Sequence, residues 1–324
     1  MKQIGNHLGG PHNAITDVPG IRVGQVTVRE EGRFNTGVTA IVPDTLPIPA
    51  AVFAGNGYGK LIGVTQVQEL GEIETPILLT GTLSAFRVAD HLVSWMLQQP
   101  GNERMTSVNP VVGETNDGYL SDIRARPITE EHVFTALRTA TTGPVAQGCV
   151  GAGAGTSMCG FKGGIGTSSR IVTAGDSDDP DGTTYGPYTV GALVQTNFGG
   201  TLVMDGTSYS VPTDPSPEYG SCMIVVATDA PLDARQLERI ARRAVFAMAR
   251  VGASYSHGSG DYAIAISTRT EGCLPDAALS PMFTSTMDAV ESALLNSVLH
   301  AETTHGPDGH VRRSFRDCYP GVET

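Results

Sequence analysis

Apolar and polar positions alternate along the first half of the chain in short runs that Gly and Pro interrupt. Residues Ile21–Val28 alternate as a half-buried β-strand does, and three further apolar runs have the length of buried strands. These runs are Gly37–Val42, Ala50–Ala54 and Ile77–Thr80. Thr82–Gln98 instead carries its apolar residues near helical spacing, which predicts a helix.

The middle of the chain continues this mixture of strands and helices. Val108–Gly113 and Thr189–Asn197 read as strands, and Thr129–Ala140 reads as a helix that starts at Thr129 and ends before a Gly-Pro pair. Residues 148–166 are extremely rich in Gly. We expect close backbone packing or substrate approach there, because Gly has no side chain to keep neighbouring atoms away.

The clearest break in the pattern is Asp205–Gly220, a polar segment with three Pro residues that we expect to be an exposed, flexible connection. A continuous apolar run, Cys222–Ala227, begins directly after it and predicts a strand buried on both faces. Cys222 would point away from Ser221, toward the core.

The last third of the chain predicts two helices, Asp233–Val251 and Phe283–His300, with a strand at Tyr262–Ser267 between them. The tail from Glu302 to Thr324 is polar, and we expect it to be peripheral. Strands interleaved with helices indicate a layered α+β or α/β fold.

Composition narrows the function classes. The chain has 324 residues, 40% of them hydrophobic, and a formal net charge of −12, which argues against nucleic-acid binding. No apolar run is long enough to span a membrane. No signal peptide is evident, so we expect the cytoplasm, or the periplasm if a signal has been removed. The five Cys residues form no CxxC pair, which favours reduced thiols and gives no metal site.

Three tempting motifs are discounted. Gly55–Lys60 lacks the spacing of a phosphate-binding loop, and Gly151–Gly155 has no clean strand before it, as a dinucleotide-binding turn requires. A Ser-His-Asp triad could be assembled from Ser259, His257 and Asp261. Residues so close in sequence rarely face one another in that way, so this interpretation is not preferred.

The Gly220-Ser221 junction carries the candidate chemistry. Gly220 places no side chain in the way of attack on its carbonyl, and the Ser221 hydroxyl could attack that carbonyl in an N→O acyl shift. Hydrolysis of the ester would then free an N-terminal Ser whose amine, with a reference pKa of about 7.7–8.0, can act as a base. From residue types alone, an ordinary loop-to-strand junction explains the same pattern more economically.

A family resemblance changes that balance. The segment from Gly220 to Leu232 closely resembles the start of the β-chain in the DmpA/BapA family of L-aminopeptidase D-amidase/D-esterases and β-peptidyl aminopeptidases. Further stretches resemble the family in the same order along the chain: Thr16–Gly24, Gly113–Leu120, Lys162–Arg170, Val194–Gly199 and Gly258–Asp261. The resemblance therefore covers nearly the whole chain.

The resemblance implies a fold and a processing event. The fold would be α+β, a four-layer αββα sandwich similar to N-terminal-nucleophile hydrolases but with different strand connectivity. Residues 1–324 would form a single domain, cut into an α-chain of residues 1–220 and a β-chain of residues 221–324 that stay associated. Family members commonly assemble as homotetramers. The resemblance implies neither a cofactor nor a metal.

The resemblance also implies roles for particular residues. Ser221 would be the nucleophile, freed by a cut between Gly220 and Ser221, and Ser259 and Asp261 would orient it. Asp261 stands where other members carry Glu. Asn197 and Tyr119 would contact the oxyanion and the substrate. Glu114 lies in the same loop as Tyr119, and a carboxylate there could bind the free ammonium of the substrate. A turn cap for Asn197 and a solvated loop acid for Glu114 are the plainer alternatives.

The leading function is therefore hydrolysis of the N-terminal amide or ester bond of a small peptide or amino-acid amide, with β- or D-amino acyl groups tolerated. Cleavage of pantetheine-type or nylon-oligomer amides, or acyl transfer to an amine, is the alternative on the same scaffold. An ornithine-acetyltransferase-type enzyme usually has Thr in place of Ser221. A binding protein without catalysis is disfavoured by the intact set of site residues.

Overall fold

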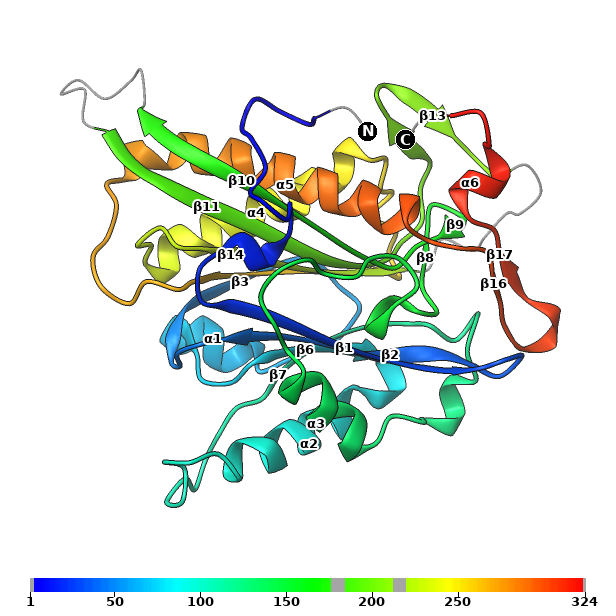
Figure 1. Cartoon of the computed structure of the whole chain (residues 1–324), viewed down its shortest axis with the longest axis horizontal. Coiled ribbons are helices and arrows are strands. Elements are labelled where there is room, and N and C mark those ends of the chain that lie inside the picture. Colours follow the sequence, from blue (N-terminus) through cyan, green and yellow to red (C-terminus); the bar gives the residue numbers. More distant parts are fainter. Residues whose placement is uncertain (1–2, 176–183, 212–219, 323–324) are drawn as a thin grey trace.

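The computed structural model describes residues 3–175, 184–211 and 220–322. Two sheets account for most of the strands (Figure 1). The five-stranded sheet has the order β1 (Ile21–Glu30), β2 (Phe34–Pro43), β6 (Ile77–Gly81), β7 (Val111–Thr115) and β4 (Leu61–Ile62). The six-stranded sheet has the order β10 (Ile165–Gly175), β11 (Thr184–Asn197), β14 (Ser221–Thr228), β15 (Gly260–Ser267), β3 (Ile48–Gly57) and β5 (Glu72–Ile73).

Helices cover the outer face of each sheet, so the molecule has four layers in the order αββα (Figure 1). The main helices are α2 (Ala85–Leu97) and α3 (Glu130–Arg138) on the five-stranded sheet and α4 (Ala234–Arg250) and α5 (Leu279–Leu299) on the six-stranded sheet. The shorter elements are α1 (Val64–Leu70), α6 (Phe315–Cys318) and three hairpins, β8 (Ser157–Met158) with β9 (Phe161–Lys162), β12 (Leu202–Met204) with β13 (Thr207–Tyr209), and β16 (Thr304–His305) with β17 (Val311–Arg312).

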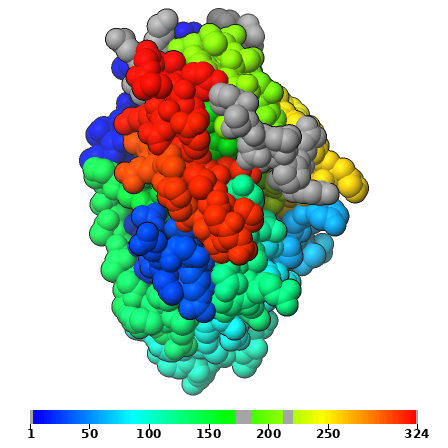
Figure 2. All heavy atoms as spheres, turned by 90° about the vertical axis from the view of Figure 1, so that its right-hand side faces the viewer, coloured from blue at the N-terminus to red at the C-terminus, as the bar shows by residue number. Residues whose placement is uncertain are grey.

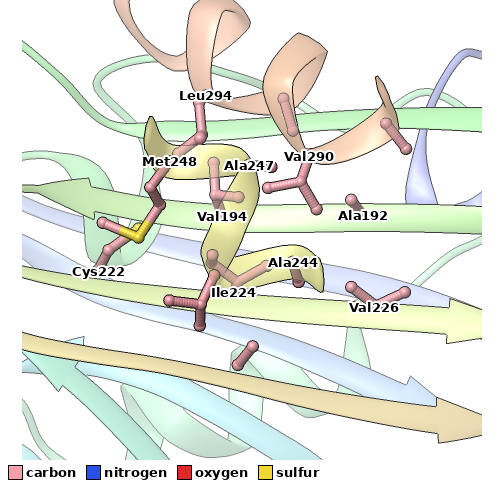
Figure 3. Packing of buried hydrophobic residues seen from close by; sticks show 14 of the residues in the cluster. Ala192, Val194, Cys222, Ile224, Val226, Ala244, Ala247, Met248, Val290 and Leu294 are labelled. Carbon is pink, nitrogen blue, oxygen red and sulfur yellow. The ribbon is translucent and has the colours of Figure 1, made fainter. Parts of the chain in front are cut away.

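Strand β14 is the centre of the core. Its even-numbered residues Cys222 and Ile224 pack with α4 and α5 (Figure 3). Met223 and Val225 instead pack between the two sheets. Because successive side chains of a strand point to opposite faces, both faces of β14 are buried and its sequence is apolar without interruption. The prediction that Cys222 belongs to the core is confirmed, since it is fully buried.

Most of the predicted elements are present with shifted ends. The two helices of the last third are found, although α5 begins at Leu279, four residues before the predicted start, because Pro281 is tolerated in a first helical turn. Among the described residues, the polar segment after Asp205 contains strand β13, and residues 212–219 lie outside the described part of the chain.

Strand β10 was missed, and the reason is its polar sequence. Ser168 and Ser169 are completely buried, which the hydrophobic pattern gives no reason to expect. Their polar atoms are satisfied by the N-terminal segment: the Ser168 hydroxyl donates to Asn13 Oδ1 at 2.8 Å, and the Ser169 hydroxyl donates to Asp17 Oδ2 at 2.6 Å. Long-range hydrogen bonds thus make a polar strand stable in the interior.

The Gly-rich segment packs its backbone against other backbone, as predicted. A Cβ on Gly153 would lie 2.3 Å from the backbone nitrogen of Ile165, and one on Gly155 would lie 2.1 Å from the carbonyl oxygen of Asn35. The five Cys residues are all free thiols. Among the residues that the structure describes, no helix is long and apolar enough to cross a membrane.

Gly166 tests how tightly α5 is seated on β10. A Cβ at this position would lie 1.9 Å from the carbonyl oxygen of Ala293 in α5, so we predict that Gly166→Ala lowers the free energy of unfolding by about 1–3 kcal/mol. Thermal unfolding measures the change. Gly321→Ala is the control, because nothing lies within 4 Å of its added methyl group. Equal melting temperatures for the two variants would contradict the packing described here.

Candidate active site

Three neighbouring strand ends bring the predicted residues together. Ser221 opens β14, where it pairs with Asn197 at the end of the antiparallel strand β11 and with Gly260 at the start of the parallel strand β15. Gly260 lies between Ser259 and Asp261. Sheet register therefore places Ser221 opposite the residue that lies between its two predicted helpers, although they come from distant parts of the sequence.

Ser221 lies at the floor of a cavity of about 360 Å³. The residue is 5% exposed, and its hydroxyl donates a hydrogen bond of 2.8 Å to the carbonyl oxygen of Gly220. Gly220, Asn197, Glu114 and Tyr119 also line the cavity. The candidate nucleophile thus touches both the bond predicted to be cut and the space that a substrate would occupy.

Ser259 and Asp261 form a buried pair. The Ser259 hydroxyl donates to Asp261 Oδ1 at 2.7 Å. Burial raises the pKa of Asp261 to about 6, against the lowering effect of hydrogen bonds from the Ser259 hydroxyl and the Cys222 main chain. His257 lies instead against the Tyr58 ring, with 5.8 Å between ring centroids. Ser259 and Asp261 therefore contact each other directly, without His257 between them.

Asn197 is held in one orientation from two sides. Its Oδ1 accepts a hydrogen bond of 3.0 Å from the Ser157 main chain, and its Nδ2 donates at 2.9 Å to the carbonyl oxygen of Asn116. These partners belong to distant segments, so the side chain does not cap its own turn. An amide nitrogen carries two hydrogens, and the bond to Asn116 uses one of them.

Glu114 is a buried acid rather than a solvated loop residue. It is 2% exposed, lies in β7 and accepts a hydrogen bond of 2.8 Å from the Lys60 main chain. The Lys60 ammonium lies 3.4 Å from the same Oε1 and donates to the Thr82 hydroxyl at 2.8 Å. The cavity wall therefore carries one buried carboxylate next to one half-exposed ammonium.

Tyr119 is clamped between two side chains of the C-terminal tail. The His310 ring stacks on it with centroids 4.3 Å apart and planes 6° apart, and the Arg312 guanidinium lies 3.8 Å from its centroid. Arg312 itself lines the cavity. The expectation that the tail is peripheral was wrong: Arg312 of β17 reaches the cavity, and Phe315, further along the tail, is fully buried. The tail, orange to red in Figure 2, lies across this face of the molecule.

Comparison with known proteins identifies the family of this chain. The profile of peptidase family S58 matches residues 13–312. The chain belongs to peptidase family S58. It is 36% identical to the β-peptidyl aminopeptidase BapA of Sphingosinicella microcystinivorans over 93% of this chain and 85% of that protein.

Solved structures extend the likeness to the fold. The L-aminopeptidase D-Ala-esterase/amidase of Ochrobactrum anthropi, described as a prototype for the serine aminopeptidases and as a new variant of the Ntn-hydrolase fold, is 33% identical with a TM-score of 0.87. The match covers 97% of this chain and 94% of that one. A Burkholderia β-aminopeptidase is 34% identical with a TM-score of 0.85, over 99% of this chain and 98% of that one. This S58 peptidase is accordingly a serine aminopeptidase of that α+β fold.

Two residues that line the cavity, Lys60 and Arg312, are not predicted from the sequence. Lys60 was set aside with the discounted phosphate loop, and Arg312 was set aside with the polar tail. No local pattern marks them, because each reaches the cavity through tertiary folding. Among the described residues, no group of three or more His, Cys, Asp or Glu side chains could hold a metal ion.

Asp117 is a further buried acid of this S58 peptidase, close to the site. Burial raises its pKa to about 6, the Thr36 hydroxyl and Lys162 lower it, and Glu114 raises it. A Cβ on Gly81 would lie 2.6 Å from its carboxylate, so no larger residue fits at position 81 without displacing Asp117. The Asp117 carboxylate therefore packs directly against Gly81 at the end of β6.

The raised pKa predicts how stability depends on pH. Its ordinary value is 3.8 and its folded value is about 6, so the folded protein binds the proton more tightly. The contribution of Asp117 to stability is greatest below pH 4 and is lost as the pH rises through 6. Between pH 7 and pH 5, the parent should gain about 1 kcal/mol relative to Asp117→Asn.

Urea unfolding at pH 5, 6 and 7 measures this gain. Every protein is made in a Ser221→Ala background, so that no cut at Ser221 complicates the transition. The exposed residue Asp90 provides the control, and Asp90→Asn should follow the parent at every pH. Parallel curves for the parent and Asp117→Asn would show that Asp117 has an ordinary pKa.

Proposed function

We propose that the chain cuts its own Gly220–Ser221 bond and then uses the freed Ser221 as the nucleophile of an aminopeptidase. The observation that carries the proposal is the contact of 2.8 Å between the Ser221 hydroxyl and the Gly220 carbonyl oxygen. Close packing also supports it, because a Cβ on Gly220 would lie 2.5 Å from the Cα of Phe198. Only Gly leaves the carbonyl in this position.

The proposed self-cleavage consists of an N→O acyl shift followed by hydrolysis of the resulting ester. Ser221 Oγ bonds to the carbonyl carbon of Gly220, and the Oγ proton passes through Ser259 to Asp261. The carbon–nitrogen bond then breaks, and the nitrogen takes up a proton to become the amine of Ser221. Water finally attacks the ester, which releases the Gly220 carboxylate and restores the Ser221 hydroxyl.

The proposed turnover of substrate reuses the same groups. The neutral amine of Ser221 accepts the Oγ proton as Oγ attacks the amide carbonyl of the substrate, and it returns a proton to the leaving amine. Ser259 and Asp261 hold that amine in place. The second amide hydrogen of Asn197 serves the developing oxyanion, because the side chain is already fixed by Ser157 and Asn116.

The position of Glu114 supports the proposal that the substrate carries a free amine. A buried carboxylate in the wall of the Ser221 cavity provides the charge that an N-terminal ammonium requires, and the Tyr119 side chain lines the same cavity. The cavity of about 360 Å³ suits a short peptide or amino-acid amide. The name of the BapA relative extends the proposed substrates to β-amino acyl groups. The homotetramer stays a prediction.

Ser221→Ala tests the self-cleavage. This variant should remain one full-length chain and lose all amide hydrolysis, whereas the parent should separate into residues 1–220 and 221–324. Denaturing gels of fresh and aged samples, with mass spectrometry of each band, measure the outcome. Ser254→Ala is the matched control at an exposed serine and should be cut normally. A parent chain that stays whole while hydrolysing amides would refute the proposal.

Glu114→Gln tests recognition of the amine. The variant keeps the shape of the side chain but loses its charge. Alanine p-nitroanilide carries a free amine and propionyl p-nitroanilide does not. We predict that the preference for the first substrate over the second falls about 10- to 100-fold. The ratio of kcat/KM for the two substrates is the readout. The exposed Glu69→Gln variant should keep the parent ratio. An unchanged ratio in Glu114→Gln would move amine recognition elsewhere.

A further inference from the structure

The carbonyl oxygen of Gly220 accepts two hydrogen bonds. One comes from the Ser221 hydroxyl at 2.8 Å, and the other comes from the main-chain nitrogen of Gly260 at 3.1 Å. The second bond is the first rung of the parallel pairing between β14 and β15, in which Ser221 lies opposite Gly260. The six-stranded sheet therefore holds the Gly220–Ser221 peptide group in place through a hydrogen bond to its carbonyl oxygen.

We propose that the main-chain N–H of Gly260 is the oxyanion donor of the self-cleavage reaction. When Ser221 Oγ bonds to the carbonyl carbon, the electron pair of the carbonyl double bond moves to the Gly220 oxygen. The Gly260 N–H already points at that oxygen, so it meets the new negative charge without rearrangement. A donor that is in place before the charge develops stabilises the transition state at no cost of reorganisation.

The backbone around Gly260 keeps this donor in position. A Cβ on Gly260 would lie 2.7 Å from the Cα of Gly59, so the two chains touch through their backbones. The Tyr58 nitrogen donates to the Ser259 carbonyl oxygen at 3.2 Å, and the Ser259 nitrogen donates to the carbonyl oxygen of Ser256 at 2.9 Å. The start of β15 is thereby fixed between β14 on one side and the end of β3 on the other.

The acceptor is fixed from its own side as well. A Cβ on Gly220 would lie 2.6 Å from the carbonyl oxygen of Asn197, which means that Gly220 rests directly on the end of β11. The donor and the acceptor thus both belong to Gly residues, and the backbone of each packs directly against the backbone of a neighbouring segment. The same packing explains why a side chain at either position would move the oxygen away from the N–H.

The proposed donor rests on the self-cleavage proposed above, and an experiment can separate the two. A main-chain N–H can be deleted by replacing the residue with its hydroxy acid, which turns the amide into an ester. Full-length radiolabelled chain is made by cell-free translation with an amber codon at position 260, read by a suppressor tRNA that carries glycolic acid. The same tRNA charged with glycine restores the natural chain as the reference.

A second ester provides the matched control. Tyr262 lies two residues further along β15, so its N–H points toward β14 as that of Gly260 does. Replacing it with the corresponding hydroxy acid removes an equivalent ladder bond away from Gly220. The readout is the rate at which labelled residues 1–220 appear on a gel. Breakage of the ester itself gives fragments of other sizes, so the two events are distinguished.

We expect the ester at position 260 to slow the cut about 100- to 1,000-fold, as the loss of one oxyanion donor does elsewhere. The ester at position 262 should cut at close to the reference rate. A position-260 ester that cuts as fast as the reference, or two esters that are slowed equally, would overturn the role of Gly260 and leave self-cleavage standing. If the glycine reference itself stays whole, the self-cleavage proposal fails instead.

Discussion

The parallel pairing of β14 with β15 is the constraint on which the site depends. It places Ser221 opposite Gly260, the residue between the hydrogen-bonded Ser259 and Asp261. The pairing is secure because β14 is buried on both faces, between α4 and α5 on one side and the five-stranded sheet on the other. Fixing a reactive group at the end of a rigid strand limits its freedom more than a loop could.

Buried charge is the second feature of the site. Asp261 and Asp117 both have pKa values raised to about 6 by burial, and Glu114 is almost completely enclosed. Carboxylates in such places weaken the fold near neutral pH unless other groups compensate. Of these three acids, Glu114 lines the Ser221 cavity. Carboxylates with perturbed pKa values, such as Asp261 and Asp117, are characteristic of functional sites.

Much of the fold could be predicted from the sequence, and the failures have a common cause. Strand β14 is recognisable because its apolar run is unbroken, and α4 because its apolar residues recur on one face, which is buried. Strand β10 is hidden by its buried serines. Ser221, Ser259, Asp261 and Asn197 were identified through family resemblance, whereas Lys60 and Arg312 reach the cavity from segments with no local signal. In each of these cases, the position of the residue depends on contacts between segments that are distant in the sequence.

The central claim is that the chain is cut between Gly220 and Ser221 and that water takes up the Gly220 acyl group. Translation of the chain in heavy-oxygen water, followed by mass spectrometry, tests it most directly. The account predicts a fragment that ends at Gly220 with one heavy oxygen in its terminal carboxylate, and a second fragment that begins with an unmodified Ser221. A protein that retains its full-length mass yet hydrolyses amides, or one that is cut at another bond, would contradict the account.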